Sequence, residues 1–143
     1  MYETPFLGKL CELETDEQTM RQCLESCSHL NQKEIGHQLA LLREQYAQSM
    51  SKLDSFIQNG RSPAIVALAE AQKEYYQKIQ QITEDALPHY LHSETSTQKE
   101  DIREARMLYA EYSIDFARTT ILQALIAVLD GMEMQWAWKQ EER

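Results

Sequence analysis

Two residues in this sequence, Glu34 and His37, have the side chains and the spacing of a metal site. Three positions apart on a helix, they project to the same side. The Glu-x-x-His pattern is how some helical bundles hold a pair of iron ions, together with carboxylates from facing helices. Glu104 and Glu111 are carboxylates that a later helix would offer, although the sequence has no second Glu-x-x-His. A metal-binding helical bundle is therefore our alternative hypothesis, and a solvated helix start explains the same residues.

Histidine and cysteine pairs give two weaker metal candidates. His89 and His92 lie together in a predicted turn and could bind zinc, but no spaced cysteine or carboxylate pair accompanies them. Cys23 and Cys27 are four residues apart, with Cys11 upstream, whereas structural zinc sites usually use closer spacing. A free cysteine on a helix face packs as a small apolar residue. We therefore expect core packing for these cysteines and predict no cofactor.

The sequence contains no glycine-rich phosphate loop and no nucleophile elbow. We name no catalytic residue for this reason, and a non-enzymatic role is favoured over an enzymatic one.

Charge and cysteine content limit the partners and the compartment. Fourteen Lys and Arg against 23 Asp and Glu give a net charge of −9. A surface this acidic repels nucleic acid and anionic membranes, and the sequence shows no basic patch. Residues 1–5 lack the basic start of a secretory signal, and three cysteines cannot all pair within the chain. We expect a cytoplasmic protein that does not bind nucleic acid.

Apolar residues recur every three or four positions along most of the chain, which is typical of amphipathic helices. No stretch alternates with the period of two that a strand requires. The sequence therefore predicts an all-α fold. The clearest helical stripe consists of Ile35, Leu39, Leu42, Tyr46, Met50, Leu53 and Phe56.

Capping signals place the helix boundaries. Thr15, Asn31 and Thr97 each precede a Glu or Gln by three positions, as in a capping box. Ser62-Pro63 predicts another helix start, and Pro88 predicts a turn that extends to Ser96. Short loops favour antiparallel neighbours, so we predict one up-down bundle domain over 1–143, with one short and three long helices. The expected helices lie near 16–30, 32–58, 63–87 and 98–130, with the last possible to 140.

The most apolar stretch of the chain lies near its C-terminus, at 116–138. Arg118 and Asp130 enclose only 11 residues, whereas a membrane span needs about 20 apolar ones. We therefore expect no membrane insertion. A buried core helix and a subunit interface remain as alternatives. Gly131 leaves a second question open, because the helix either ends there or continues past it.

These observations favour a protein–protein interaction module of the adaptor, chaperone or regulator type. We expect it to bind a protein partner or to form a homodimer through its last helix. Methionine and tryptophan are enriched at adaptable surfaces and binding hot spots. The predicted association residues are Leu122, Leu125, Ile126, Leu129, Met132, Trp136 and Trp138.

Overall fold

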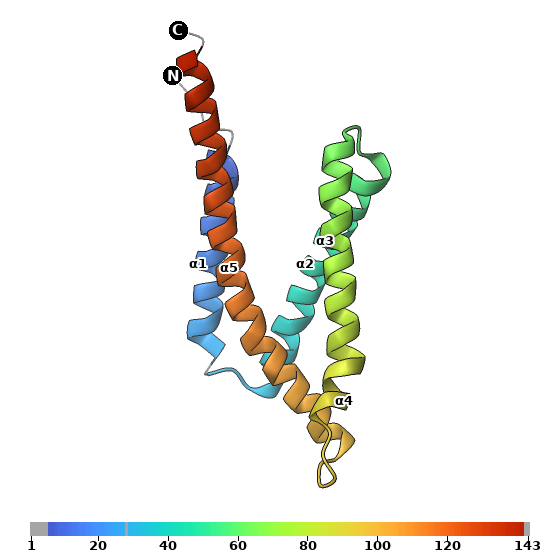
Figure 1. Ribbon diagram of the computed structural model, residues 1–143. Helices are drawn as coiled ribbons and strands as arrows, with labels where there is room; N and C mark the ends of the chain where they lie inside the picture. The colour runs from blue at the N-terminus through green and yellow to red at the C-terminus, as the bar shows by residue number, and fades with distance from the viewer. Residues whose placement is uncertain (1–5, 28, 142–143) are drawn as a thin grey trace. The chain divides into compact units, whose positions relative to one another are not determined.

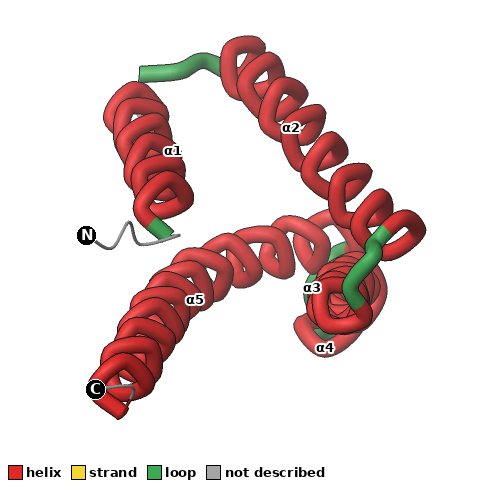
Figure 2. The backbone as a smooth tube through the Cα atoms, turned by 90° about the horizontal axis from the view of Figure 1, so that it is seen from above, coloured by secondary structure: helices red, strands yellow, loops and turns green. Residues whose placement is uncertain are grey.

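The computed structural model describes residues 6–27 and 29–141, and all regular structure in those ranges is helical (Figure 2). The all-α prediction is confirmed. The elements in chain order are α1 (Leu7–Cys27), α2 (Gln32–Asn59), α3 (Pro63–Gln81), the π-helical turn η1 (Ile82–Ala86), α4 (Leu87–Leu91) and α5 (Gln98–Glu141). Figure 1 labels the five α-helices.

Contacts along the chain divide it into two units, Met1–Glu70 and Ala71–Arg143. The first holds α1, α2 and the beginning of α3. The second holds the rest of α3 together with η1, α4 and α5. The single bundle domain therefore stays a prediction.

Two of the predicted capping boxes are confirmed. At the start of α2, Asn31 Oδ1 accepts a hydrogen bond from the Glu34 amide at 2.9 Å, and the Glu34 carboxylate accepts one from the Asn31 amide at 3.2 Å. At the start of α5, Thr97 and Glu100 make the same reciprocal pair, both at 3.2 Å. These bonds satisfy amide groups that have no partner inside the helix, and so they fix where both helices begin.

The predicted capping box at Thr15 is wrong. Helix α1 begins at Leu7 and ends at Cys27, so Thr15 lies in its interior and its hydroxyl donates to the Cys11 carbonyl at 3.0 Å. A threonine inside a helix commonly satisfies its hydroxyl this way. The preceding residues are mostly Leu, Lys and Glu, which favour helix and allow α1 to start a full two turns earlier. The predicted helix near 16–30 includes Ser28, which lies outside the described residues.

The turn predicted after Leu87 is also wrong in its position, because the helix continues to Leu91 as α4. A proline ring clashes with the carbonyl four residues earlier in an ordinary α-helix. Here the π-helical turn η1 precedes Pro88, and the Leu87 amide bonds to the Ile82 carbonyl five residues back. This wider turn accommodates the ring without breaking the helix. The chain then turns at residues 92–97, before α5.

Helix α5 is one continuous element of 44 residues and passes through Gly131. The question that the sequence left open is thus settled in favour of continuation. At 1.5 Å per residue the helix is about 66 Å long. The apolar stretch and both tryptophans therefore lie on the same rigid element.

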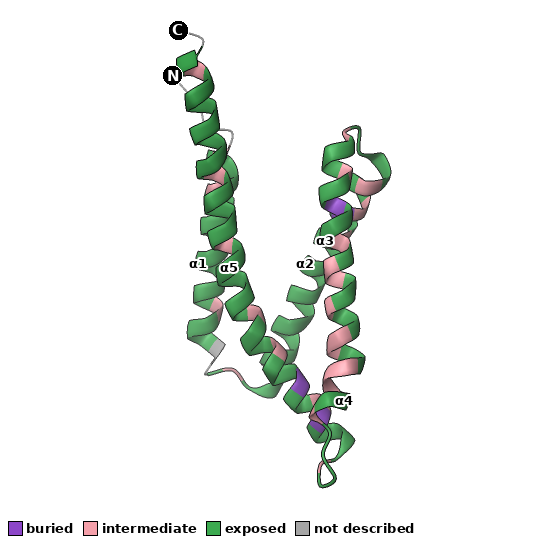
Figure 3. Ribbon diagram, viewed as in Figure 1, coloured by how far each residue is buried: buried purple, intermediate pink, exposed green. Residues whose placement is uncertain are grey.

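Few described residues are buried, as the purple positions in Figure 3 show. Leu53 and Ala69 are buried in the first unit, and Asp101 and Ala105 in the second. In the second unit the first turns of α5 pack against η1 and α4. The buried residues of α5 thus lie in its first turns.

An aromatic contact continues this packing along α5. Phe116 stacks on Tyr75 of α3, with ring centroids 5.0 Å apart and an interplanar angle of 10°. Tyr112 lies 6.3 Å from Phe116 on the same helix. Burial raises the pKa of Tyr75, and the nearby Tyr109 and Tyr112 raise it further, so its hydroxyl stays neutral. Aromatic pairs of this kind add to the stability that area burial provides.

Two glycines of the first unit should respond oppositely to alanine. Gly60 follows α2 with φ of −64°, which alanine adopts, but a Cβ there would clash with the Phe56 carbonyl oxygen and lie 2.7 Å from Val66 Cγ2. We expect Gly60→Ala to destabilise the fold by about 1–3 kcal/mol. Gly36, inside α2, has open space around it, so Gly36→Ala should stabilise by about 0.5–1 kcal/mol. Thermal unfolding followed by circular dichroism measures both, and equal shifts would contradict the Gly60 contact.

Candidate functional site

The C-terminal half of α5 exposes large apolar side chains. Five of the predicted association residues share one direction, and we call them the α5 stripe: Leu122, Leu125, Leu129, Met132 and Trp136. Their exposed fractions are 59%, 43%, 64%, 39% and 67%. At 100° per residue they fall within about 80° of one another around the helix. The stripe therefore presents a continuous apolar face that nothing in its own unit covers.

The other two predicted residues, Ile126 and Trp138, are 66% and 61% exposed. They point away from the centre of the stripe by about 80° and 160° respectively. All seven predicted association residues are therefore exposed, and the helix geometry divides them into two groups. Ile126 borders the stripe, whereas Trp138 lies on the far side of α5.

The apolar face of the α5 stripe continues toward the start of α5. Met107 and Ile114 are 65% and 63% exposed, and both fall within about 60° of Leu125 around the helix. Neither residue was among the predicted association residues, although the spacing of seven positions from Met107 to Ile114 and then to Ile121 was a signal in the sequence. From Met107 to Trp136 the apolar face is about 45 Å long.

The metal candidates gain no support from the described residues, where no group of three or more His, Cys, Asp or Glu side chains could hold a metal ion. Glu34, His37, Glu104 and Glu111 are all exposed. Cys11 is exposed, Cys23 is half-buried, and the side chain of Cys27 lies outside the described residues. His89 and His92 line one small cavity of about 250 Å³.

His92 instead serves a buried carboxylate in the turn before α5. Its Nδ1 lies 2.7 Å from Asp101 Oδ2, and the Asp101 side chain is 6% exposed. The nearby Ser96 hydroxyl lowers the pKa of Asp101, burial opposes this, and His92 adds to the lowering through its hydrogen bond and its charge. An ionised carboxylate only accepts hydrogen bonds, so Nδ1 carries a proton. The arrangement joins the α4 end of the turn to the first turn of α5.

The lowered pKa of Asp101 predicts a dependence of stability on acid. A carboxyl group with a lowered folded pKa stabilises the fold above its ordinary pKa range, and this contribution is lost as the pH falls through the folded value. We expect the thermal midpoint of the wild type to exceed that of Asp101→Asn at pH 6–7. The difference should shrink below about pH 4. Thermal unfolding of both proteins from pH 7 to pH 2.5 measures it, and a constant difference would contradict the role of the Asp101 charge.

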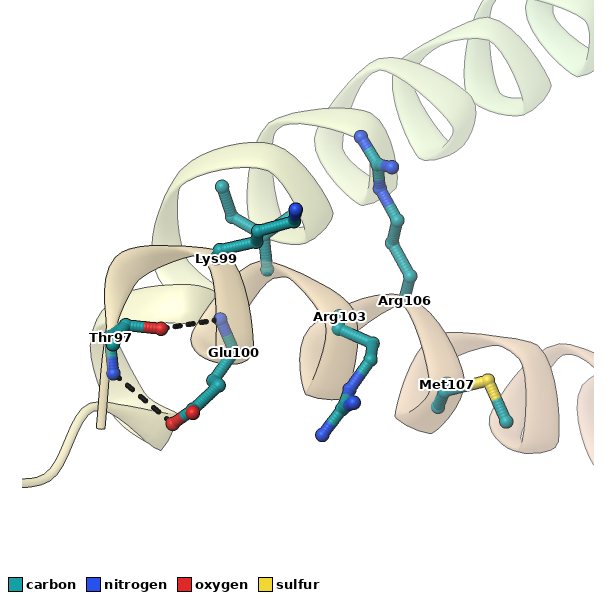
Figure 4. Close-up of a pocket in the computed structure, with 7 residues that line it drawn as sticks. Thr97, Lys99, Glu100, Arg103, Arg106 and Met107 are labelled. Atoms are coloured by element: carbon teal, nitrogen blue, oxygen red, sulfur yellow. Dashed lines mark hydrogen bonds between the residues drawn. The ribbon is translucent and has the colours of Figure 1, made fainter. Parts of the chain in front are cut away.

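A second cavity, of about 560 Å³, lies along the beginning of α5 (Figure 4). Lys99, Arg103 and Arg106 line it, together with Glu100, which is engaged in the capping box with Thr97. The sequence analysis found no basic patch because the same segment contains as many acidic as basic residues. The i, i+4, i+7 spacing of the three cations was the signal for it.

No family model, curated protein or solved structure matches this chain. Within the described residues α5 is also the one helix long and apolar enough to cross a membrane, with an 18-residue stretch of mean hydropathy 1.2 and none of that stretch buried. The exposed apolar face of α5 is therefore the main candidate for a functional surface.

Proposed function

We propose that this chain is a helical protein–protein interaction module that forms a homodimer through the α5 stripe. The exposure of the five stripe residues carries this proposal. Full burial of one large apolar side chain stabilises a fold or a complex by about 1.5–3 kcal/mol. Roughly half of the surface of each stripe residue is still exposed and can be buried by a partner. A contiguous apolar face of this length marks an interaction surface.

The length of α5 favours a second copy as the occupant of the stripe. Helix α5 has 44 residues, whereas α1, α2 and α3 have 21, 28 and 19. Since helix length rises with residue number, none of these three helices can cover the whole of α5. Another α5 matches it along its full length. We infer that paired α5 helices form the centre of the assembly.

The remaining helices then complete an antiparallel up-down bundle around the pair. Exposed apolar residues on α2 include Ile35, Leu39 and Leu42, so this helix also offers a face that needs cover. Helices joined by short loops pack as antiparallel neighbours. The bundle arrangement is thus part of the proposal, as is a cytoplasmic location for an acidic protein of this kind.

Sedimentation equilibrium over a wide concentration range tests the proposal. We expect the mass of two chains at micromolar concentrations, with dissociation on dilution. A protein that is a monomer at all concentrations would contradict the proposed homodimer. Flotation with lipid vesicles is the companion measurement, because an exposed apolar helix of this length also fits a bilayer. Stable insertion of α5 into vesicles would replace the dimer with a membrane anchor.

A further inference from the structure

The beginning of α5 leaves three cations unpaired. Lys99, Arg103 and Arg106 fall within about 60° of one another around the helix. Within residues 6–27 and 29–141 none of them makes an ion pair or a side-chain hydrogen bond. In a chain with a net charge of −9, three cations on one face without a partner require an explanation.

The fold engages or turns away the acidic residues that neighbour these cations in sequence, although Glu100 also lines the cavity. The segment 98–107 contains Lys99, Arg103 and Arg106 and an equal number of acidic residues: Glu100, Asp101 and Glu104. Glu100 folds back to accept from the Thr97 amide, and Asp101 is buried against His92. Glu104 points about 130° away from the centre of the three cations. Three cations and one carboxylate, that of Glu100, thus line the cavity, so its net charge is positive although the segment as a whole is neutral.

The position of this face along the helix disfavours cations. The N-terminal end of a helix carries partial positive charge, which repels a cation in the first turn such as Lys99 and attracts an anion. Helix stability therefore gives no reason for a lysine at this position. An anion bound there would be stabilised by the dipole and by all three side chains.

We propose that the cavity at the beginning of α5 binds phosphate groups. Guanidinium groups match the geometry of phosphate oxygens and bind them through paired hydrogen bonds. The cavity volume of about 560 Å³ lies in the range of small-molecule sites, and Ile102 and Met107 give it apolar walls. The ligand class is thus a phosphate ester that carries an apolar part. Arg103 and Arg106 extend in different directions in Figure 4, and both are exposed, so both can rotate toward a ligand.

Titration with inorganic pyrophosphate, followed by calorimetry and by amide chemical shifts, tests this site. We expect binding, with the largest shifts between Thr97 and Met107. The double variant Arg103→Gln/Arg106→Gln should lose affinity by about tenfold or more. The matched control Lys33→Gln/Arg43→Gln removes two exposed cations of α2 and should leave the affinity unchanged. Equal losses in the two double variants would overturn the site, because they would reduce it to general charge attraction.

Vesicles containing phosphatidylinositol bisphosphate separate the two sources of phosphate. Binding of pyrophosphate would show that the cavity binds a soluble phosphate group without a membrane. Binding of vesicles alone, lost in Arg103→Gln/Arg106→Gln, identifies a lipid headgroup and supports the same cavity. Absence of both kinds of binding in the wild type would overturn the proposal. The charge-retaining variant Arg103→Lys/Arg106→Lys should keep part of the affinity, which excludes misfolding as the cause of a loss.

Discussion

Leu125→Glu is expected to convert the proposed dimer into a monomer at micromolar concentrations. Leu125 lies near the middle of the α5 stripe, and a two-fold dimer contains it twice. Each copy loses an apolar contact and brings a charge into a desolvated surface, at a combined cost of about 4 kcal/mol. The dissociation constant should rise by roughly 1000-fold. Sedimentation equilibrium of the variant measures this directly.

The matched control is Gln123→Glu, two residues away on the same helix. Gln123 is exposed and points about 140° from the centre of the stripe, so the same added charge should leave the dimer intact. Circular dichroism separates assembly from folding, because both variants should keep their helical content. A Leu125→Glu protein that remains a dimer with the affinity of the wild type would contradict the role of the stripe.

Ala105→Glu is expected to disrupt the packing of α5 against η1 and α4. Ala105 is 1% exposed, so a longer side chain has no room and its charge has no water. Overpacking typically costs about 1–3 kcal/mol, and burial of an unpaired charge adds several more. We expect the thermal midpoint to fall by ten degrees or more, on the order of what such a loss gives for a chain of this size.

Ala127→Glu provides the control for this substitution. Ala127 lies on the same helix, is exposed, and points away from the α5 stripe by about 180°. The same exchange there should change the thermal midpoint by no more than about 2 °C, as is usual for surface substitutions. Similar losses in the two variants would show that glutamate disturbs α5 generally, and the packing of Ala105 would then not be the cause.

Local signals predicted most of the helices. The boxes at Asn31 and Thr97 could be read because a capping residue bonds to an amide three positions away, and both ends of the interaction are visible in the sequence. The box at Thr15 failed because the same spacing occurs inside a helix, where threonine bonds backward to Cys11. The continuation through Pro88 also could not be read, since a π-helical turn has no sequence signature as clear as that of proline.

The candidate sites could also be predicted only in part from local sequence signals. Helical spacing shows which apolar residues of α5 share a face, but it does not show whether that face is buried or exposed. The engagement of Asp101 by His92 could not be predicted in this way, because it depends on how the turn at residues 92–97 brings the two side chains together. Helical spacing does place Lys99, Arg103 and Arg106 on one face, but it does not show that Glu100 and Asp101 are engaged by other groups.

The measurement that tests the central claim most directly is an isotope-filtered nuclear Overhauser experiment on a mixture of labelled and unlabelled chains. It detects only contacts between two copies. We predict contacts between copies that involve the methyl groups of Leu122, Leu125, Leu129 and Met132. If these methyl groups contact only residues of their own chain in a protein that is otherwise a dimer, the α5 stripe is a core face and the account of self-association through it is wrong.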